Sequence, residues 1–150
     1  MKHILSTLVS LFSFSVGYAC SCMNPGEINE EQYNSYDFIA SGIISKVETN
    51  EHTRTFWLLT EQSYKGNESG EVMIHTAANS AACGLSVQKG DTWLIYAYAD
   101  EEGFRTNLCT RSAPLKSEGQ SGISPRTQND LEFLERKVGA VTPPKTEPYT

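Results

Sequence analysis

The four cysteines constrain this chain more than any other feature of its sequence. All of them lie beyond the first nineteen residues: Cys20, Cys22, Cys83 and Cys109. In an exported protein an even number of cysteines indicates a disulfide framework, and four cysteines allow three pairings. A bond between Cys20 and Cys22 would close a strained small ring and tie down nothing else. Either of the other two pairings would close loops of roughly 60 to 90 residues, and each bond would stabilise the fold by about 4 kcal/mol.

A zinc site made of four thiolates is the competing interpretation of the same cysteines. Structural zinc sites favour gaps of two to four residues within a cysteine pair. Cys20-Ser21-Cys22 has a gap of one residue. We therefore predict two disulfides, and no metal or cofactor of the protein's own.

Residues 1–19 have the layout of a secretory signal peptide. Lys2 gives a basic start, an apolar run follows, and Gly17 and Ala19 are small residues at the −3 and −1 positions before a cut at Cys20. The run is too short to cross a bilayer, and no other segment is apolar enough to do so. We predict export to the periplasm or the outside of the cell. A lipid-anchored bacterial lipoprotein is the alternative, although such signals usually carry Leu where Gly17 stands.

The mature chain is the length of one domain. Removal of residues 1–19 from the 150 leaves 131 residues, and the loss of Lys2 takes the formal charge from −6 to −7. We assign residues 20–140 to the domain and residues 141–150 to a disordered tail. The acidic balance argues against nucleic acid or an anionic membrane as partner, and we expect a monomer.

Segments typical of β-strands dominate the mature region. They are rich in β-branched and aromatic residues, they are separated by turns that contain glycine, and they cover residues 37–47, 54–64, 71–76, 92–98 and 104–111. Gly42 predicts a bend or bulge in the first of them, and the last carries Cys109. Short strands at this spacing predict an antiparallel sandwich or barrel.

Two helices are expected outside these strands. The first, a short helix or a turn, lies within residues 27–36. An amphipathic one covers residues 127–138, with Thr127 as its N-cap, after a loop rich in Ser and Gly. Its apolar side consists of Leu131, Phe133, Leu134 and Val138.

The sequence offers little catalytic chemistry. His52 and His75 are the only histidines beyond residue 19, and neither belongs to a HExxH pattern. No serine lies in a nucleophile-elbow motif, and no glycine-rich phosphate loop is present. Because a Ser-His-Asp triad assembles only in space, an exported hydrolase stays a minor alternative. We predict that the protein is not an enzyme.

A new N-terminus at Cys20 has metal-binding chemistry of its own. A free α-amino group has a pKa of about 8, so part of it is neutral and able to bind a metal. It forms a five-membered chelate ring with the carbonyl oxygen of the same residue. A catalytic zinc protease leaves one metal position to water, which such a chelate can displace. Because ordering a flexible end costs about 1 to 2 kcal/mol per residue, disulfides at the first and third mature positions would favour this binding.

The segment Cys20-Ser21-Cys22 followed by Pro25 resembles the mature start of the tissue inhibitors of metalloproteinases, a family built on the netrin-like module. Further similar segments follow in the family's order: Asn34-Ser35-Tyr36-Asp37-Phe38-Ile39, Ser63-Tyr64-Lys65-Gly66, Ala82-Cys83-Gly84, residues 92–98, Asn107-Leu108-Cys109 and Ala113-Pro114. The resemblance covers roughly residues 20–140. It implies an OB-fold-like, five-stranded antiparallel barrel with flanking helices, stapled by disulfides.

The resemblance also implies the roles of particular residues. Cys20 would be bonded to Cys83, and Cys22 to Cys109. Cys20 would chelate the zinc of a target metalloproteinase, and Ser21 would enter the protease's S1′ pocket. The full set of protease contacts would be Cys20, Ser21, Cys22, Met23, Ser80, Ala81 and Ala82.

Three features depart from the family pattern. The third disulfide of this domain is missing, with Tyr33 near one expected cysteine, and the separate C-terminal subdomain is absent. The contact ridge is small, because Ala81 and Ala82 offer little area to bury. Since a shared fold does not imply a shared function, the alternative is a non-inhibitory, secreted or periplasmic netrin-like binding module.

Overall fold

A computed structural model describes residues 20–119 and 121–139. The predicted signal peptide and the predicted tail therefore lie outside the described residues. Within the described ranges, neither helix has the length and apolar character needed to cross a membrane.

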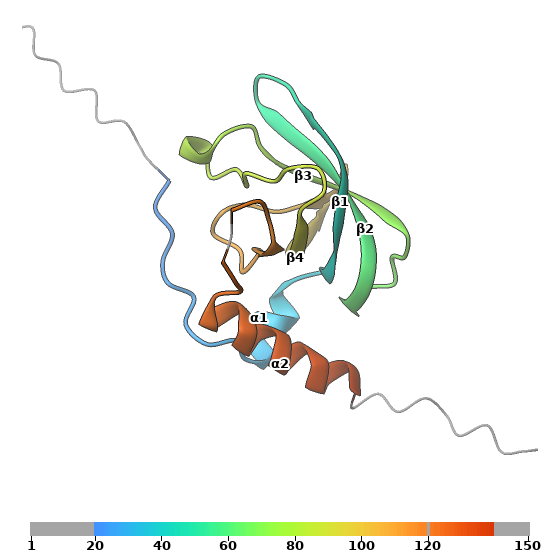
Figure 1. Cartoon of the computed structure of the whole chain (residues 1–150), viewed down its shortest axis with the longest axis vertical. Helices are drawn as coiled ribbons and strands as arrows, with labels where there is room; N and C mark the ends of the chain where they lie inside the picture. Colours follow the sequence, from blue (N-terminus) through green and yellow to red (C-terminus); the bar gives the residue numbers. More distant parts are fainter. Residues whose placement is uncertain (1–19, 120, 140–150) are drawn as a thin grey trace, which may run out of the picture.

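Five strands form a closed barrel (Figure 1). They are β1 (Phe38–Thr49), β2 (Thr53–Lys65), β3 (Glu71–Ala77), β4 (Thr92–Asp100) and β5 (Gly103–Arg105). The order around the barrel is β1-β2-β3-β5-β4, and pairing of β1 with β4 closes it. The predicted OB-fold-like barrel with flanking helices is confirmed, with one refinement. The short β5 pairs parallel with β3, whereas the other four pairings of the barrel are antiparallel.

The first strand bends at Gly42, as the sequence predicts. The register of β1 against β2 shifts between Ser41 and Gly42. A Cβ atom at Gly42 would lie 2.2 Å from the carbonyl oxygen of Leu59, so only glycine allows this close approach of the two strands. The bend lets β1 pair with β2 on one edge and with β4 on the other.

Alternation along β4 gives the protein two apolar clusters. Trp93, Ile95 and Ala97 point into the barrel, whereas Leu94 and Tyr96 belong to a second cluster outside it. The barrel interior is completed by Phe38, Ala40, Ile44, Phe56, Leu58, Val72, Ile74, Leu85 and Val87. The second cluster adds Tyr36, Ile39 and Leu134, and so connects the barrel wall to the two helices. Burial on both faces explains why β4 is the most apolar strand.

The expected strand over residues 104–111 is wrong. Pairing stops after Arg105, and a further strand, β6 (Ala113–Lys116), pairs with the edge of β4. Side-chain hydroxyls replace ladder hydrogen bonds at this place. Thr106 Oγ1 donates to the carbonyl oxygen of Tyr96 at 2.8 Å, and the Tyr96 amide donates to Ser112 Oγ at 2.9 Å. Cys109 therefore lies in a loop between β5 and β6.

Two α-helices lie together against the outside of the barrel (Figure 1). In α1 (Glu30–Ser35), the Asn29 side chain caps the N-terminus by accepting from the Gln32 amide. The second helix, α2 (Pro125–Gly139), begins earlier than the sequence predicts. Ser124 Oγ accepts from the Thr127 amide at 3.2 Å, so Ser124 takes the capping position. The prediction of Thr127 as N-cap is wrong, because that residue is buried within the first turn.

Candidate functional site

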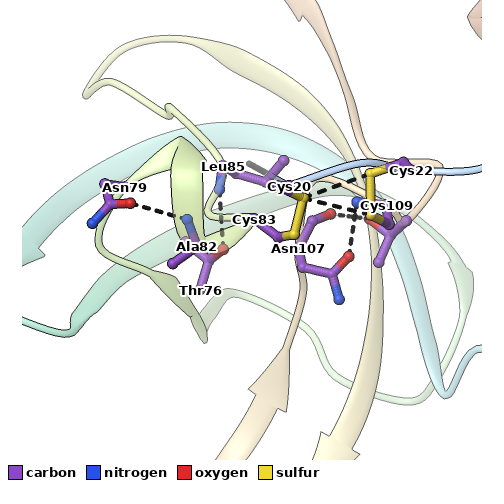
Figure 2. The surroundings of a disulfide bond; sticks show 10 residues. Cys20, Cys22, Thr76, Asn79, Ala82, Cys83, Leu85, Asn107 and Cys109 are labelled. Atoms are coloured by element: carbon purple, nitrogen blue, oxygen red, sulfur yellow. Dashed lines mark hydrogen bonds between the residues drawn. A yellow bond between two sulfur atoms is a disulfide. The ribbon is translucent and has the colours of Figure 1, made fainter. Parts of the chain in front are cut away.

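Two disulfides attach the start of the described chain to two loops of the barrel. Cys20 is bonded to Cys83 and Cys22 to Cys109, with Cα–Cα distances of 5.2 and 5.1 Å. This is the pairing that the resemblance implies. Figure 2 shows the two bonds next to each other, with the N-terminal segment crossing both loops. The Sγ atom of Cys20 lies 3.9 Å from each sulfur of the other disulfide.

Hydrogen bonds fix the loop that receives Cys20. The short 3-10 helix η1 (Ser80–Ala82) is capped by Asn79, whose side chain accepts from the Ala82 amide at 3.0 Å. Cys83 then takes a left-handed backbone conformation with φ of 64°, and its amide donates to the carbonyl oxygen of Ser80. Gly84 follows, where a Cβ atom would lie 2.0 Å from the carbonyl oxygen of Ala77. The tight backbone presents the Cys83 sulfur to the N-terminal segment.

The second loop is linked to the first. The Leu108 amide donates to the carbonyl oxygen of Cys83 at 2.7 Å, and Asn107 Oδ1 accepts from the Cys109 amide at 2.8 Å (Figure 2). The first contact joins the two loops directly, and the second fixes the turn that carries Cys109. The disulfides therefore join the N-terminal segment to two loops that are also hydrogen-bonded to each other.

The predicted contact residues form an exposed surface around these bonds. Ser21 and Cys22 are exposed, and the Met23 side chain is 90% exposed. Ser80, Ala81 and Ala82 are also exposed and reach the same place through the bond from Cys20 to Cys83. Met23 and Leu108 line a shallow cavity of about 290 Å³ beside Cys22 and Cys109. The seven predicted contact residues thus lie around the two disulfides. We call residues 20–23 and 80–82 together the N-terminal ridge.

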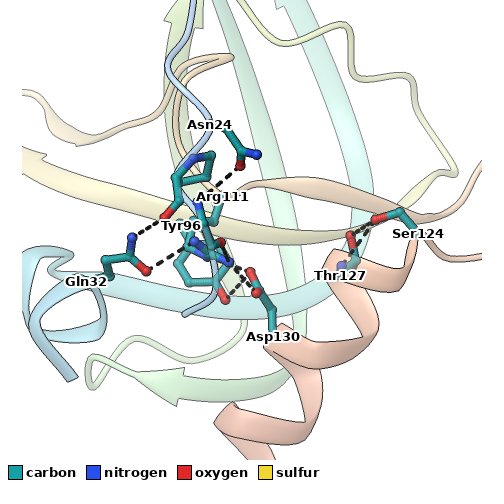
Figure 3. A network of polar contacts seen from close by, with 9 residues as sticks. Asn24, Gln32, Tyr96, Arg111, Ser124, Thr127 and Asp130 are labelled. Atoms are coloured by element: carbon teal, nitrogen blue, oxygen red, sulfur yellow. Dashed lines mark hydrogen bonds and ion pairs between the residues drawn. The ribbon is translucent and has the colours of Figure 1, made fainter. Parts of the chain in front are cut away.

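A second anchor holds the other end of the N-terminal segment. The buried Arg111 guanidinium forms a two-pronged ion pair with Asp130 of α2, with N–O distances of 2.8 and 2.6 Å. Its remaining hydrogen bonds go to the carbonyl oxygen of Gly26 at 3.0 Å and to Gln32 Oε1 of α1 at 3.2 Å. Figure 3 shows the N-terminal segment, both helices and Tyr96 of β4 meeting at this group.

Burial makes this ion pair strongly coupled to its surroundings. The side chains of Arg111 and Asp130 are each 1% exposed. Burial alone would lower the pKa of the Arg111 guanidinium, but its hydrogen bonds and its attraction to Asp130 outweigh that effect and raise the pKa. Burial, together with the nearby Asp130 charge, raises the pKa of the Tyr96 hydroxyl. That hydroxyl donates to Asp130 Oδ2 at 3.2 Å.

One sequence signal could have indicated the second anchor. Thr127, Asp130 and Leu134 are spaced by three and four residues, so all three lie on one side of α2, and all are buried. A carboxylate on the apolar side of an amphipathic helix predicts a buried cationic partner. Nothing in the sequence identified Arg111 as that partner.

The two histidines of the described residues lie in or beside the sheet. His52 is exposed, and its carbonyl oxygen accepts from the Ala78 amide at 3.0 Å. His75 lies in β3, and its Nδ1 atom is hydrogen-bonded to Thr55 Oγ1 of β2 at 2.9 Å. The His75 Nε2 atom is buried and has no hydrogen-bond partner among the described residues.

A scan against protein-family models finds no match for this chain, and a search of curated proteins finds no significant match.

Proposed function

We propose that the protein is an exported, monomeric inhibitor of zinc metalloproteinases that captures the catalytic zinc with its N-terminus. Cleavage before Cys20 frees the α-amino group of that residue. The amine and the carbonyl oxygen of Cys20 then chelate the zinc of the target and displace its water. The protein contributes no metal of its own.

The observation that carries this proposal is the double covalent attachment of the N-terminal segment, which leaves Cys20 half-buried and the next residues exposed. Cys20 and Cys22 are both bonded to the barrel, while Ser21 between them and Met23 after them stay exposed. A terminus held in this way loses little conformational entropy on binding, which favours affinity. A terminus needed only for stability would require neither this exposure nor two bonds within three residues.

The second anchor supports the same conclusion. The Arg111 contact to Gly26 holds the segment six residues beyond Cys20, so the ridge is fixed at both ends. Binding at Cys20 therefore acts on a surface whose shape is set before the partner arrives. Ser21 has a side chain small enough for an S1′ pocket, and η1, which directly precedes Cys83, would supply a second contact.

The test compares two forms of the disulfide-bonded protein, one that begins at Cys20 and one with a single additional alanine before it. Both are titrated against a panel of zinc metalloproteinases, with a serine protease as the specificity control. We expect inhibition of at least one zinc protease by the first form, and a loss of at least about a hundredfold with the alanine, because the extension turns the amine into an amide. Acetylation of the Cys20 amine is expected to have the same effect.

A matched pair of substitutions tests the ridge. Met23→Ala removes the most exposed side chain next to the disulfides, and Met73→Ala removes an exposed methionine of β3. We expect Met23→Ala alone to weaken inhibition. Equal inhibition by the native and extended termini, or inhibition by neither, would refute zinc capture for this panel and favour the netrin-like binding module.

A further inference from the structure

A shallow cavity continues the N-terminal ridge beyond Met23. Its volume is about 290 Å³, and it is lined by residues 22–25, residues 108–110 and Arg126 at the start of α2. Two of the lining side chains are large, apolar and exposed: Met23 is 90% exposed and Leu108 is 46% exposed. Among the residues that line this cavity, Arg126 alone carries a charge. The cavity therefore combines an apolar rim with one cation.

The Arg126 guanidinium has no hydrogen bond or ion pair within the part of the chain that the structure describes. Its residue is exposed, and the first turn of α2 carries no acidic residue. Arg126 also lines a neighbouring cavity of about 350 Å³ together with Glu27, but no ion pair joins these two side chains. Arg111, in contrast, is neutralised by Asp130. Arg126 thus places an unpaired positive charge beside the ridge of a chain whose formal net charge is −6.

Covalent and hydrogen bonds hold the cavity in shape. The disulfide between Cys22 and Cys109, drawn in Figure 2, joins two of its sides. Asn24 Oδ1 accepts from the Gly26 amide at 3.1 Å, which fixes the turn at the end of the lining segment. Binding at this place therefore orders little beyond the Arg126 side chain, which limits the entropy cost.

We propose that Arg126 binds a carboxylate of the target protease, while Met23 and Leu108 contact an apolar side chain next to that carboxylate. This proposal rests on the proposed function, because it takes the zinc protease as the partner. Three fully extended residues span at most about 10 Å, so with Cys20 at the zinc the carboxylate lies about 10 to 15 Å from the metal. It lies on the side of the cleft that follows the S1′ pocket.

Arg126 is then a specificity-determining residue. An unpaired guanidinium attracts a protease with Asp or Glu at this place, and it repels one with Lys or Arg. The zinc chelate at Cys20 is common to every target, whereas this contact distinguishes one target from another.

The test measures inhibition constants and association rates of the disulfide-bonded protein that begins at Cys20, at low and at physiological salt. Against the protease inhibited most strongly, we expect Arg126→Gln to weaken inhibition about three- to tenfold, mainly through slower and less salt-dependent association. Arg126→Lys keeps the charge without the two-pronged geometry and should have an intermediate effect. Arg136→Gln is the matched control, because it removes the same charge from an exposed position about 15 Å further along α2. It should leave inhibition unchanged.

A charge exchange then tests the partner's group. In the inhibited protease, the acidic residue found at this distance from the zinc is replaced by Lys, which should weaken inhibition by the unchanged protein and restore part of it with Arg126→Glu. Near-ultraviolet circular dichroism verifies that each variant is folded. Equal inhibition by Arg126→Gln and Arg136→Gln, or no recovery in the charge exchange, would overturn the carboxylate site and leave zinc capture standing. Failure of the unchanged protein to inhibit any zinc protease would refute zinc capture and this site together.

Discussion

The two ends of the N-terminal segment are held by opposite means. At Cys20 and Cys22 the attachment is covalent and lies at the surface, half-buried at Cys20 and exposed at Cys22, whereas at Gly26 it is a hydrogen bond from the buried Arg111. The strength of a disulfide depends little on the surrounding water. An ion pair such as that of Arg111 and Asp130 is directional and strongly coupled only where water is excluded.

The difference matches what each end has to do. A terminus that reaches into another protein must stay exposed, and non-covalent contacts at an exposed position are worth only about 0 to 1 kcal/mol. Disulfides are the means by which such a terminus becomes rigid. The base of the segment has no such requirement, so it is fixed by a buried network that also joins α1, α2 and β4.

The largest stability effect is expected at the buried anchor. Asp130→Ala leaves the Arg111 guanidinium buried without a counter-charge, and we expect a loss of about 3 to 5 kcal/mol in the free energy of unfolding. Urea unfolding followed by tryptophan fluorescence measures this loss. The Arg111→Met/Asp130→Leu double variant removes both charges and should cost clearly less. A loss below about 1 kcal/mol for Asp130→Ala would show that the pair does not organise the base of the segment.

A somewhat smaller effect is expected at the exposed anchor. Cys22→Ser/Cys109→Ser opens a loop with a sequence separation of 87 residues, and we expect a loss of about 2 to 4 kcal/mol. If the protein is an inhibitor, this variant should also inhibit more weakly, because its ridge is less rigid. Asp130→Ala should affect inhibition less than it affects stability. If Asp130→Ala weakened inhibition more than Cys22→Ser/Cys109→Ser did, the buried base of the N-terminal segment, and not the disulfides, would set the shape of the ridge.

Alkaline pH is expected to weaken the buried anchor through the tyrosines beside it. Burial, followed by the effect of Tyr98, raises the pKa of Tyr36 to about 12, and its ring lies 5.0 Å from that of Tyr96 beside the buried anchor. The unfolded chain loses this proton at about pH 10. The folded state keeps the proton longer, so stability is complete below pH 10 and falls as the pH rises towards 12.

The measurement is the free energy of unfolding at pH 9 and at pH 12. Two pKa units correspond to at most about 2 to 3 kcal/mol for Tyr36. Tyr36→Phe should remove that part of the loss and retain the part due to Tyr96, whose pKa is also raised. An identical loss in the variant would show that the Tyr36 hydroxyl does not titrate with folding.

The barrel could be predicted from the sequence to a greater extent than the site. Segments rich in β-branched and aromatic residues, separated by turns that contain glycine, locate the first four strands to within two residues. The end of the fifth strand could not be predicted, since the hydroxyls of Thr106 and Ser112 replace ladder hydrogen bonds only once Tyr96 is beside them. Strand β6 could not be predicted either, because proline is rare within a sheet and β6 contains Pro114. Among the described strands, β6 pairs with β4.

The two anchors differ in the same respect. Cysteines at the first and third mature positions show an attachment in the sequence itself, because a disulfide needs only a second cysteine. Arg111 gives no such signal, because one arginine among several is distinguished only by the pocket formed by α1, α2 and Gly26. Local patterns identify covalent attachments, whereas buried polar networks depend on the assembled fold.

The smallest effect is expected where the same two helices meet at the surface. Lys137 Nζ of α2 lies 2.7 Å from Glu30 Oε2 of α1, and the side chains are 34% and 63% exposed. Because water screens this pair, Lys137→Gln should cost less than about 1 kcal/mol, including its contact with the Tyr33 ring. A double-mutant cycle with Glu30→Gln isolates the coupling energy between the two charges. A coupling as large as that between Arg111 and Asp130 would mean that burial does not decide the strength of these two ion pairs.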